Sequence, residues 1–243
     1  MRKKLKTICI IPARGGSKGL KNKNIRLVNG HPLIAYVISN AINSNIFDSI
    51  MVSTDSPKIA NVAKKYGAEV PFLRKQKFSK DLTTTEDTLK NALNEYEKYK
   101  SVKFDICVYM TATDIFRQIS DIKNAVNTLK KNRNIDSCFS GRSTHKNFWY
   151  LNKSGNLQRI LKSMKNYSSR QIKKPIFRED TGIICASRAY LWRKGRRIGD
   201  NVKILINKNP IDIDIHDEYD LFLVKKTFEY FKKKGLKFLP SIK

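Results

Sequence analysis

Short apolar runs alternate along the chain with longer segments of helical periodicity. The apolar runs are typical of buried strands and lie at residues 7–11, 49–53, 70–73, 105–110, 137–140, 182–186 and 203–206. The periodic segments predict helices at residues 33–44, 56–66, 85–99, 120–132 and 217–233. This alternation predicts an α/β fold with a mostly parallel sheet, and a chain of 243 residues is long enough for one such domain across residues 1–243.

The region from residue 141 to residue 179 differs in character from the rest of the chain. It is polar and aromatic, with Phe148-Trp149-Tyr150 followed by Asn166-Tyr167, and it carries no strand–helix alternation. We interpret it as an excursion from the sheet, either a lid or a dimerisation arm.

The first apolar run opens into a glycine-rich, cationic loop at residues 12–24. Glycines let backbone N–H groups approach an anion, and Arg or Lys neutralises its charge. A P-loop would need glycine five residues after Gly15, where Leu20 stands, and the G-x-G-x-x-G pattern fails at Ser17. The loop therefore predicts a phosphate site of another kind. The candidates for binding phosphate are Arg14, Lys18 and Lys23.

Charge and cysteine usage narrow the class of protein. The net charge of +28 is spread along the whole chain, which favours composition bias plus an anionic substrate and disfavours nucleic acid as a partner. Four dispersed cysteines without a C-x-x-C pair argue against zinc and for buried free thiols. No apolar run reaches the roughly 18 residues of a membrane helix, and no secretory signal is evident, so we expect a cytoplasmic protein.

Residues 211–215 alternate strictly between Ile and Asp. In a strand, Asp212 and Asp214 would share one face, about 7 Å apart, while the isoleucines point to the other. Two carboxylates on one face suit Mg²⁺ that is also bound by phosphate oxygens and water. We therefore predict that Asp212 and Asp214 hold Mg²⁺.

The run Ala13-Arg14-Gly15-Gly16-Ser17-Lys18-Gly19-Leu20, followed by Lys-Asn, resembles the N-terminal motif of the acylneuraminate cytidylyltransferase family. Those enzymes join CTP to a nine-carbon acidic sugar and release pyrophosphate. The resemblance extends through most of the chain and implies a three-layer, Rossmann-like fold of the nucleotide-diphospho-sugar transferase type. It also implies a homodimer in which the excursion reaches the partner subunit.

The resemblance assigns roles on the nucleotide side. Arg14 and Lys23 fall on catalytic residues that hold the triphosphate, and Asn24 falls on a nucleotide contact. A register two residues earlier, onto Lys21-Asn22, would break the spacing from Arg14. The remaining residues expected to bind substrate here are Ser17, Lys18, Arg74 and Thr85, the last two in a segment with Asp81 that surrounds cytosine in the family.

On the sugar side the chain departs from the family. Where the family reads Gln-Pro-Thr-Ser-Pro-Leu-Arg, aligning Arg117 puts Thr111 on the Gln and leaves Asp114 as an unusual acid. Arg170 is expected to be a catalytic residue that pairs with the sugar carboxylate, with Gln171 beside it. Asp180 stands where the family has Asn.

We therefore predict CMP transfer from CTP to the anomeric hydroxyl of an acidic, sialic-acid-like sugar. A pseudaminic, legionaminic or Kdo-like acid is an alternative acceptor, because the departures fall on the sugar side. From a different class, a non-catalytic basic protein that binds nucleotide or RNA also fits the charge.

Overall fold

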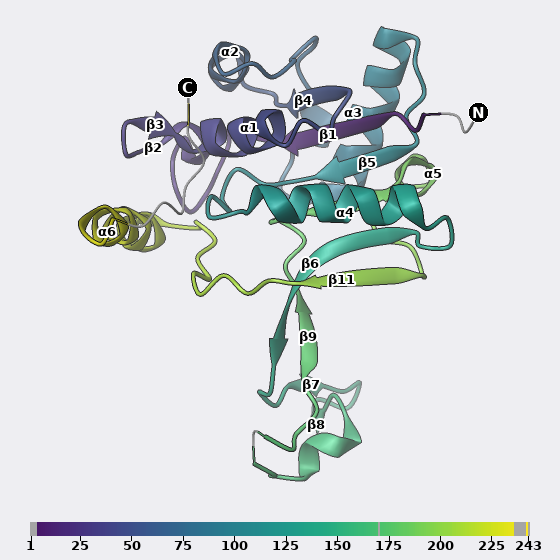
Figure 1. The fold of residues 1–243 in the computed structure, drawn as a ribbon, viewed down its shortest axis with the longest axis vertical. Coiled ribbons are helices and arrows are strands. Elements are labelled where there is room, and N and C mark those ends of the chain that lie inside the picture. Colours follow the sequence, from purple (N-terminus) through teal and green to yellow (C-terminus); the bar gives the residue numbers. More distant parts are fainter. Residues whose placement is uncertain (1–3, 170, 236–241, 243) are drawn as a thin grey trace.

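A computed structural model describes residues 4–169, 171–235 and 242 and shows a central seven-stranded sheet (Figure 1). The strands are ordered β11-β6-β10-β5-β1-β4, and β9 pairs antiparallel with the last part of β6. Strands β4, β1, β5, β6 and β11 run in one direction and β10 runs against them, so the prediction of a mostly parallel sheet is confirmed. The strands are β1 (Thr7–Pro12), β4 (Ser49–Ser53), β5 (Ile106–Tyr109), β6 (Ser137–Thr144), β9 (Ile176–Glu179), β10 (Cys185–Arg188) and β11 (Val202–Ile206).

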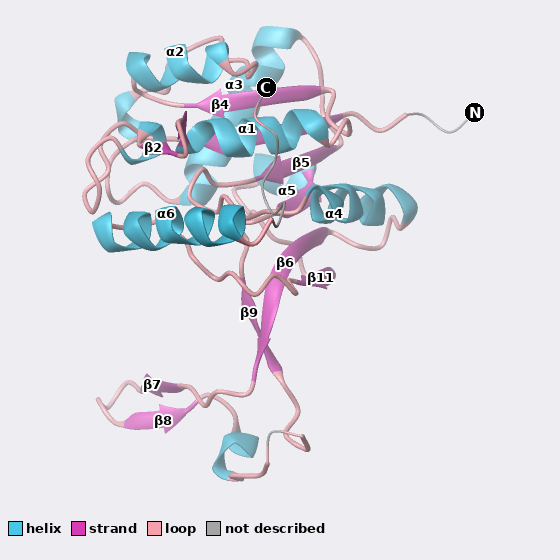
Figure 2. Ribbon diagram, turned by 60° about the vertical axis from the view of Figure 1, so that its left-hand side comes forward, coloured by secondary structure: helices cyan, strands magenta, loops and turns pink. Residues whose placement is uncertain are grey.

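Helices cover both faces of the sheet and give the expected three layers (Figure 2). One face packs against α1 (Leu33–Asn43), α2 (Pro57–Lys65) and α4 (Ile119–Lys131). The other packs against α3 (Thr85–Lys100) and the short α5 (Ala189–Arg193). A third apolar cluster joins α6 (Glu218–Lys233) to the hairpin of β2 (Leu27–Val28) and β3 (His31–Pro32).

The ends of the helices follow from local signals in the sequence. Ser56 caps α2, with Pro57 in the first turn. Asp217 and Asp220 form a capping box at the start of α6. Within the described part of the chain, every helix is too short or too polar to cross a lipid bilayer.

Near the end of α3, Glu97 is a buried carboxylate whose side chain is 1 % exposed. Its oxygens accept hydrogen bonds from Arg193 of α5, from Lys103 and from the Phe104 N–H. Burial acts to raise the pKa of Glu97, but these donors outweigh burial and lower it.

Strand side chains alternate between the two faces, and the cysteines follow this pattern. Cys9 of β1 and Cys138 of β6 belong to one apolar cluster, whereas Cys107 of β5 and Cys185 of β10 belong to the other. All four are buried free thiols, as expected, and burial raises the pKa of each.

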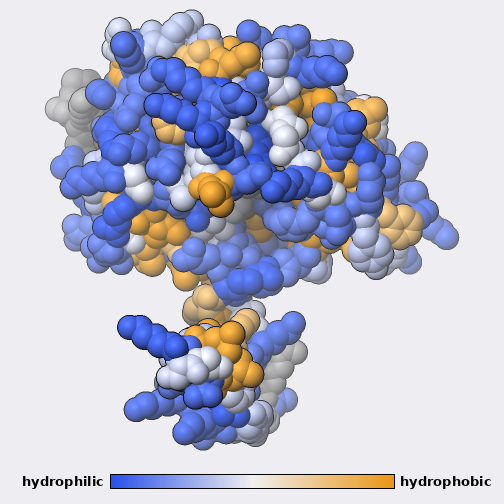
Figure 3. Space-filling view, turned by 180° about the vertical axis from the view of Figure 1, so that it is seen from behind, coloured by the Kyte–Doolittle hydropathy of each residue, from blue (hydrophilic) through white to orange (hydrophobic). Residues whose placement is uncertain are grey.

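The predicted excursion at residues 141–179 is a long arm that leaves the body of the molecule (Figures 1 and 2). Its stem is the antiparallel pairing of β6 with β9, from Gly141 opposite Glu179 to Thr144 opposite Ile176. Its tip holds the hairpin of β7 (Trp149–Leu151) and β8 (Leu157–Arg159), followed by a 3-10 turn, η3 (Lys162–Lys165). Apolar side chains gather on the surface of the arm (Figure 3).

One strand prediction is wrong, and the strand considered for residues 211–215 does not form. At residues 70–73 no strand forms, and one isolated bridge between Met51 and Glu69 takes its place beside β4. Residues 211–215 are extended but pair with no strand. Their isoleucines still face the third apolar cluster while Asp212 and Asp214 stay exposed, so the predicted alternation of burial holds without the hydrogen bonds of a sheet.

Candidate active site

The loops after β1, β4 and β5 meet at one edge of the sheet, where parallel strands place their carboxyl ends. A cavity of ≈ 520 Å³, here called the first-loop cavity, opens at this edge. It brings together seven residues predicted from sequence: Arg14, Ser17, Lys18, Lys23, Asn24, Thr85 and Thr111.

Two further cavities adjoin the first-loop cavity. The Arg74 cavity, of ≈ 250 Å³, shares Pro12, Arg14 and Thr85 with it. The acidic cavity, of ≈ 500 Å³, shares Tyr109, Thr111 and His216 with it. The carboxylates that line the acidic cavity are Asp114, Glu179, Asp180, Asp212, Asp214 and Asp220.

The first loop is held by side chains that follow the neighbouring strand. Asp55, just after β4, accepts a hydrogen bond from the Gly15 N–H at 2.8 Å. The amide of Asn24 donates to the Arg14 carbonyl at 3.0 Å and closes the loop. Asn24 and Asp55 therefore shape the loop.

The loop's cations have different partners. Arg14 and Lys18 both pair with Asp81, at 2.9 and 2.7 Å, and these two cations lower the pKa of that carboxyl. Lys23 instead donates to the Ile215 carbonyl at 2.9 Å. Burial lowers the pKa of Lys23 and nearby Asp214 opposes this effect. Lys23 thus ties the first loop to the Asp-Ile-Asp segment.

Gly19 lies so close to that segment that no side chain fits. A Cβ on Gly19 would stand 2.6 Å from the His216 carbonyl oxygen, well inside contact distance. The first loop and residues 211–216 therefore form one packed unit around the first-loop cavity.

Arg74 is buried, its side chain 4 % exposed, and lines the Arg74 cavity with Thr85. Its Nε donates to Ser79 Oγ at 3.0 Å, and its guanidinium stands 4.0 Å from Asp55. Burial lowers the pKa of Arg74 and Asp55 opposes this. Arg74 therefore forms the fixed wall of a small polar pocket beside Arg14.

In the acidic cavity, Thr111 Oγ1 donates to Asp114 Oδ2 at 2.6 Å. Burial, and then the charge of Asp214, raise the pKa of Asp114 to about 6. Arg117, 3 % exposed, lies beneath this loop and donates to the carbonyls of Thr111, Gly182 and Ile183. Arg117 was not among the predicted site residues, although it ends the quoted motif.

Asp212 and Asp214 line the same cavity, although no strand places them there. Among the described residues, no three His, Cys, Asp or Glu side chains converge as a ready metal site. Two carboxylates in a cavity beside the cations of the first loop nevertheless match Mg²⁺, which usually takes one or two carboxylates and completes its shell with phosphate and water. The residues present fit this ion.

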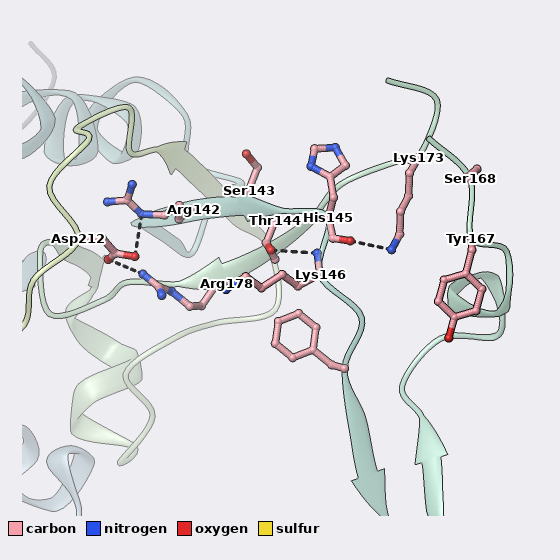
Figure 4. Close-up of a pocket in the computed structure, with 11 residues that line it drawn as sticks. Arg142, Ser143, Thr144, His145, Lys146, Tyr167, Ser168, Lys173, Arg178 and Asp212 are labelled. Atoms are coloured by element: carbon pink, nitrogen blue, oxygen red, sulfur yellow. Dashed lines mark hydrogen bonds and ion pairs between the residues drawn. The ribbon is translucent and has the colours of Figure 1, made fainter. Parts of the chain in front are cut away.

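The stem of the arm contributes residues that sequence reasoning did not assign. Arg178 pairs with Asp180 and Asp212, each at 2.7 Å, and Arg142 approaches the same two carboxylates at 3.7 and 3.5 Å. These four side chains form a closed ring of alternating charge, part of which Figure 4 shows. The register of β6 against β9 places Arg142 opposite Arg178. No signal in the sequence joins Arg142 to Asp212, because their approach depends on how the segment after β11 folds against β6, where Arg142 donates to the carbonyls of Asn209 and Ile211.

Beyond this ring lies a cavity of ≈ 730 Å³, the arm-root cavity, which shares Arg178 and Asp212 with the acidic cavity (Figure 4). Its other cations are Arg142, Lys146 and Lys173. Lys173 Nζ donates to the His145 carbonyl and to Asn147, fastening the two sides of the arm.

The structure does not bring the predicted Gln171 to these cavities. Gln171 is exposed in the arm, accepts a hydrogen bond from Ser169 at 2.7 Å and lines none of the four cavities. Arg170, predicted to meet the sugar carboxylate, lies outside the described residues.

The sheet order and the loop cavities at its carboxyl edge define an α/β protein of the nucleotide-diphospho-sugar transferase type. The family model described as Cytidylyltransferase matches residues 8–238, and the chain belongs to that family. The resemblance stated from the first loop is confirmed at this level.

Individual relatives support this family membership. The chain is 33% identical over 218 residues to a CMP-N,N'-diacetyllegionaminic acid synthase of Campylobacter jejuni, covering 90% of this chain and 93% of the relative. It is 45% identical over 109 residues to a C. jejuni pseudaminic acid cytidylyltransferase, covering 44% and 47% of the two chains. A solved structure of CMP:2-keto-3-deoxy-manno-octonic acid synthetase complexed with CTP matches with a TM-score of 0.69 at 14% identity, covering 93% and 99% of the chains, and so shares the fold.

Proposed function

We propose that the protein transfers CMP from CTP to the anomeric hydroxyl of an acidic nine-carbon, sialic-acid-like sugar and releases pyrophosphate. The observation that carries this proposal is the convergence of seven predicted residues in the first-loop cavity, directly beside the cavity that holds Asp212 and Asp214. Membership of the Cytidylyltransferase family supports it.

CTP fits the two cavities that share Arg14. The polar Arg74 cavity, with threonines on its rim, offers the donors and acceptors that a pyrimidine edge requires. Arg14, Lys18 and Lys23 then face the triphosphate. Arg14 and Lys18 already share one carboxylate, Asp81, so phosphate oxygens can replace it without leaving either cation unpaired.

The reaction needs positioning and charge neutralisation more than a covalent nucleophile. The anomeric oxygen forms a bond to the α-phosphorus, the bond from that phosphorus to the bridging oxygen breaks, and the hydroxyl proton passes to solvent. Asp212 and Asp214 are the residues that would hold Mg²⁺, which supplies positive charge to the departing pyrophosphate when it is bound. Lys23, tied to Ile215, holds the triphosphate against this segment.

The acceptor occupies the acidic cavity and extends toward the arm. Cations of the arm-root cavity, Arg142, Lys146 and Arg178, offer partners for a sugar carboxylate. Arg170 and Gln171 remain expectations from the family resemblance. The two relatives above are named for legionaminic and pseudaminic acids, so these acids, together with Kdo-like acids, are the alternative acceptors within the proposal.

We further propose a homodimer joined through the arms. Leu151 and Leu157, at the tip hairpin, are 67 % and 68 % exposed, and Tyr167 is 78 % exposed. Apolar side chains gathered on one segment indicate a contact surface. Light scattering should give twice the mass of one chain, and the double substitution Leu151→Asp with Leu157→Asp should halve it; a wild-type monomer would refute the dimer.

The experiment that tests the transfer reaction incubates the protein with CTP, Mg²⁺ and a panel of acidic sugars and measures pyrophosphate. Asp214→Asn should lower turnover at least about 100-fold while the thermal melt is unchanged. Asp200→Asn, at an exposed carboxylate paired with Arg196, is the matched control and should keep full activity. Silence across the panel together with tight, salt-sensitive RNA binding would replace the enzyme by a nucleic-acid-binding protein.

A further inference from the structure

Asp114 has no role in the function proposed above. It stands in the loop after β5, where the motif of the family carries a small residue and a proline, and it lines the acidic cavity. A carboxylate at this point faces the acceptor side of the site, next to Thr111, which also lines the first-loop cavity.

The carboxylate of Asp114 is fixed in place. Thr111 Oγ1 binds Oδ2 at 2.6 Å, and Gly182 lies directly against it. A Cβ at Gly182 would stand 2.4 Å from Asp114 Oδ2 and 3.0 Å from Thr111 Oγ1. The Arg117 guanidinium donates hydrogen bonds to the Gly182 and Thr111 carbonyls and so holds the backbone beside Asp114. The group is therefore preorganised rather than free to swing.

Asp114 nevertheless has acceptor capacity to spare. Among the described residues, Thr111 supplies the one hydrogen bond that its carboxylate accepts, whereas an ionised carboxylate offers about four lone-pair sites. Three of the neighbouring carboxylates already have partners: Asp212 and Asp180 pair with arginines, and Asp214 lies 3.1 Å from the ring of His216. Asp114 is thus a carboxylate of this cavity that is held in a fixed position and whose remaining lone pairs a ligand donor can satisfy.

The distribution of charge orients the acceptor. The acidic cavity repels a sugar carboxylate, while the adjoining arm-root cavity carries Arg142, Lys146 and Lys173. The acceptor's acid group therefore points toward the arm, and its hydrogen-bond donors point toward Asp114.

We propose that Asp114 is a specificity-determining residue that accepts a hydrogen bond from an N–H or O–H substituent of the acceptor sugar. This inference rests on the proposed function and deepens it: the acceptor carries a donor on the side away from its carboxylate. A site built to bind a donor rejects an analogue that lacks it, because the buried acceptor is left unpaired.

The test compares acceptors with wild type, Asp114→Asn and Asp114→Ala. The acceptors form a series of nine-carbon acidic sugars. At one carbon at a time, the substituent is an acetamido group, a hydroxyl group or hydrogen, and every carbon that can carry a donor is varied in turn. For wild type we expect kcat/KM to fall at least about ten-fold when the donor at the recognised carbon is removed. In Asp114→Ala this ratio should collapse to about one, and the KM for CTP should stay within about two-fold. The comparison of the acetamido and hydroxyl sugars separates the two donor chemistries.

The control is Asp121→Asn, which removes a partly buried carboxylate in the first turn of α4, away from these cavities. It should keep the wild-type discrimination. Asparagine has the same shape as aspartate, so Asp114→Asn should keep the conformation of the loop. This variant allows the measurement even if Asp114→Ala fails to fold. The inference is overturned if both Asp114 variants keep the wild-type ratio of kcat/KM between acceptors with and without the donor. It is also overturned if wild type shows the same kcat/KM whichever donor is removed. In either case, turnover by wild type still supports the proposed function. Absence of any turnover in wild type rejects both.

Discussion

Arg117→Met removes the guanidinium that fastens the wall of the acidic cavity while keeping most of the aliphatic volume. The side chain of Arg117 lies beneath the loop after β5, where it donates to the Thr111 carbonyl at 2.9 Å, to the Gly182 carbonyl at 2.8 Å and to the Ile183 carbonyl. After the substitution, these carbonyls lose the charged donor that a side chain only 3 % exposed supplies to them.

The magnitude follows from these three hydrogen bonds. A hydrogen bond to a charged group contributes about 1.5–3 kcal/mol, so three give roughly 5–9 kcal/mol in total. Burying the guanidinium costs several kcal/mol, which the substitution recovers. The net loss is then about 3 kcal/mol, a large share of the roughly 5–15 kcal/mol that stabilises a typical domain.

Urea unfolding followed by circular dichroism measures this loss. With a slope of about 3 kcal/mol/M, the midpoint should fall by about 1 M. Arg196→Met, at an exposed arginine paired with Asp200, is the control and should leave the midpoint unchanged. Because the same carbonyls position Thr111, Arg117→Met should also raise the KM for the acceptor more than the KM for CTP. A midpoint within about 0.2 M of wild type would refute the reasoning.

Three further predictions concern pH, the first loop and the arm. The pKa of Glu97 in the folded protein lies below its ordinary value of 4.5, so the stability that ionised Glu97 contributes is complete above that pH and is lost as pH falls through the folded value. Acid unfolding should therefore be less steep in Glu97→Gln. An unchanged acid-unfolding profile would contradict a stabilising role of the ionised carboxylate. Gly19→Ala, whose Cβ would stand 2.6 Å from a backbone carbonyl oxygen before α6, should raise the KM for CTP at least about ten-fold. Gly16→Ala meets nothing within 4 Å and should not. Asp180→Asn leaves Asp212 as the carboxylate that pairs with both stem arginines, so a titration of activity and of direct Mg²⁺ binding should show weaker affinity for the ion; equal affinity would contradict a coupling between the ring and the ion site.

The parts of the fold that the sequence predicts correctly are those decided by neighbours along the chain. Ser56-Pro57 starts α2 because both residues act within one turn of helix. The pattern at residues 211–215 reports which side chains are buried, and it does so correctly for Ile215. It does not report whether a partner strand is present, and these residues pair with none. The strand predicted at residues 70–73 fails for the same reason.

The residues of the candidate site also divide into those that local sequence predicts and those that depend on contacts between distant segments. The residues of the first loop were predictable because one contiguous segment carries them to a strand end. The ring of Arg142, Arg178, Asp180 and Asp212 was not predictable, because the register of β6 against β9 brings the two arginines together and a third segment, after β11, supplies Asp212. Arg117 has an ordinary sequence context, and its structural role follows only from its complete burial against the turn at Gly182.

The four cysteines lie on β6, β10, β5 and β1, which are consecutive in the sheet, and two face each side. A buried, protonated thiol reacts with a maleimide only when its strand is exposed to solvent. The chain therefore carries a native reporter on each of four adjacent strands. Labelling rates at the individual thiols would show whether the sheet opens from one edge or all at once, without any engineered probe.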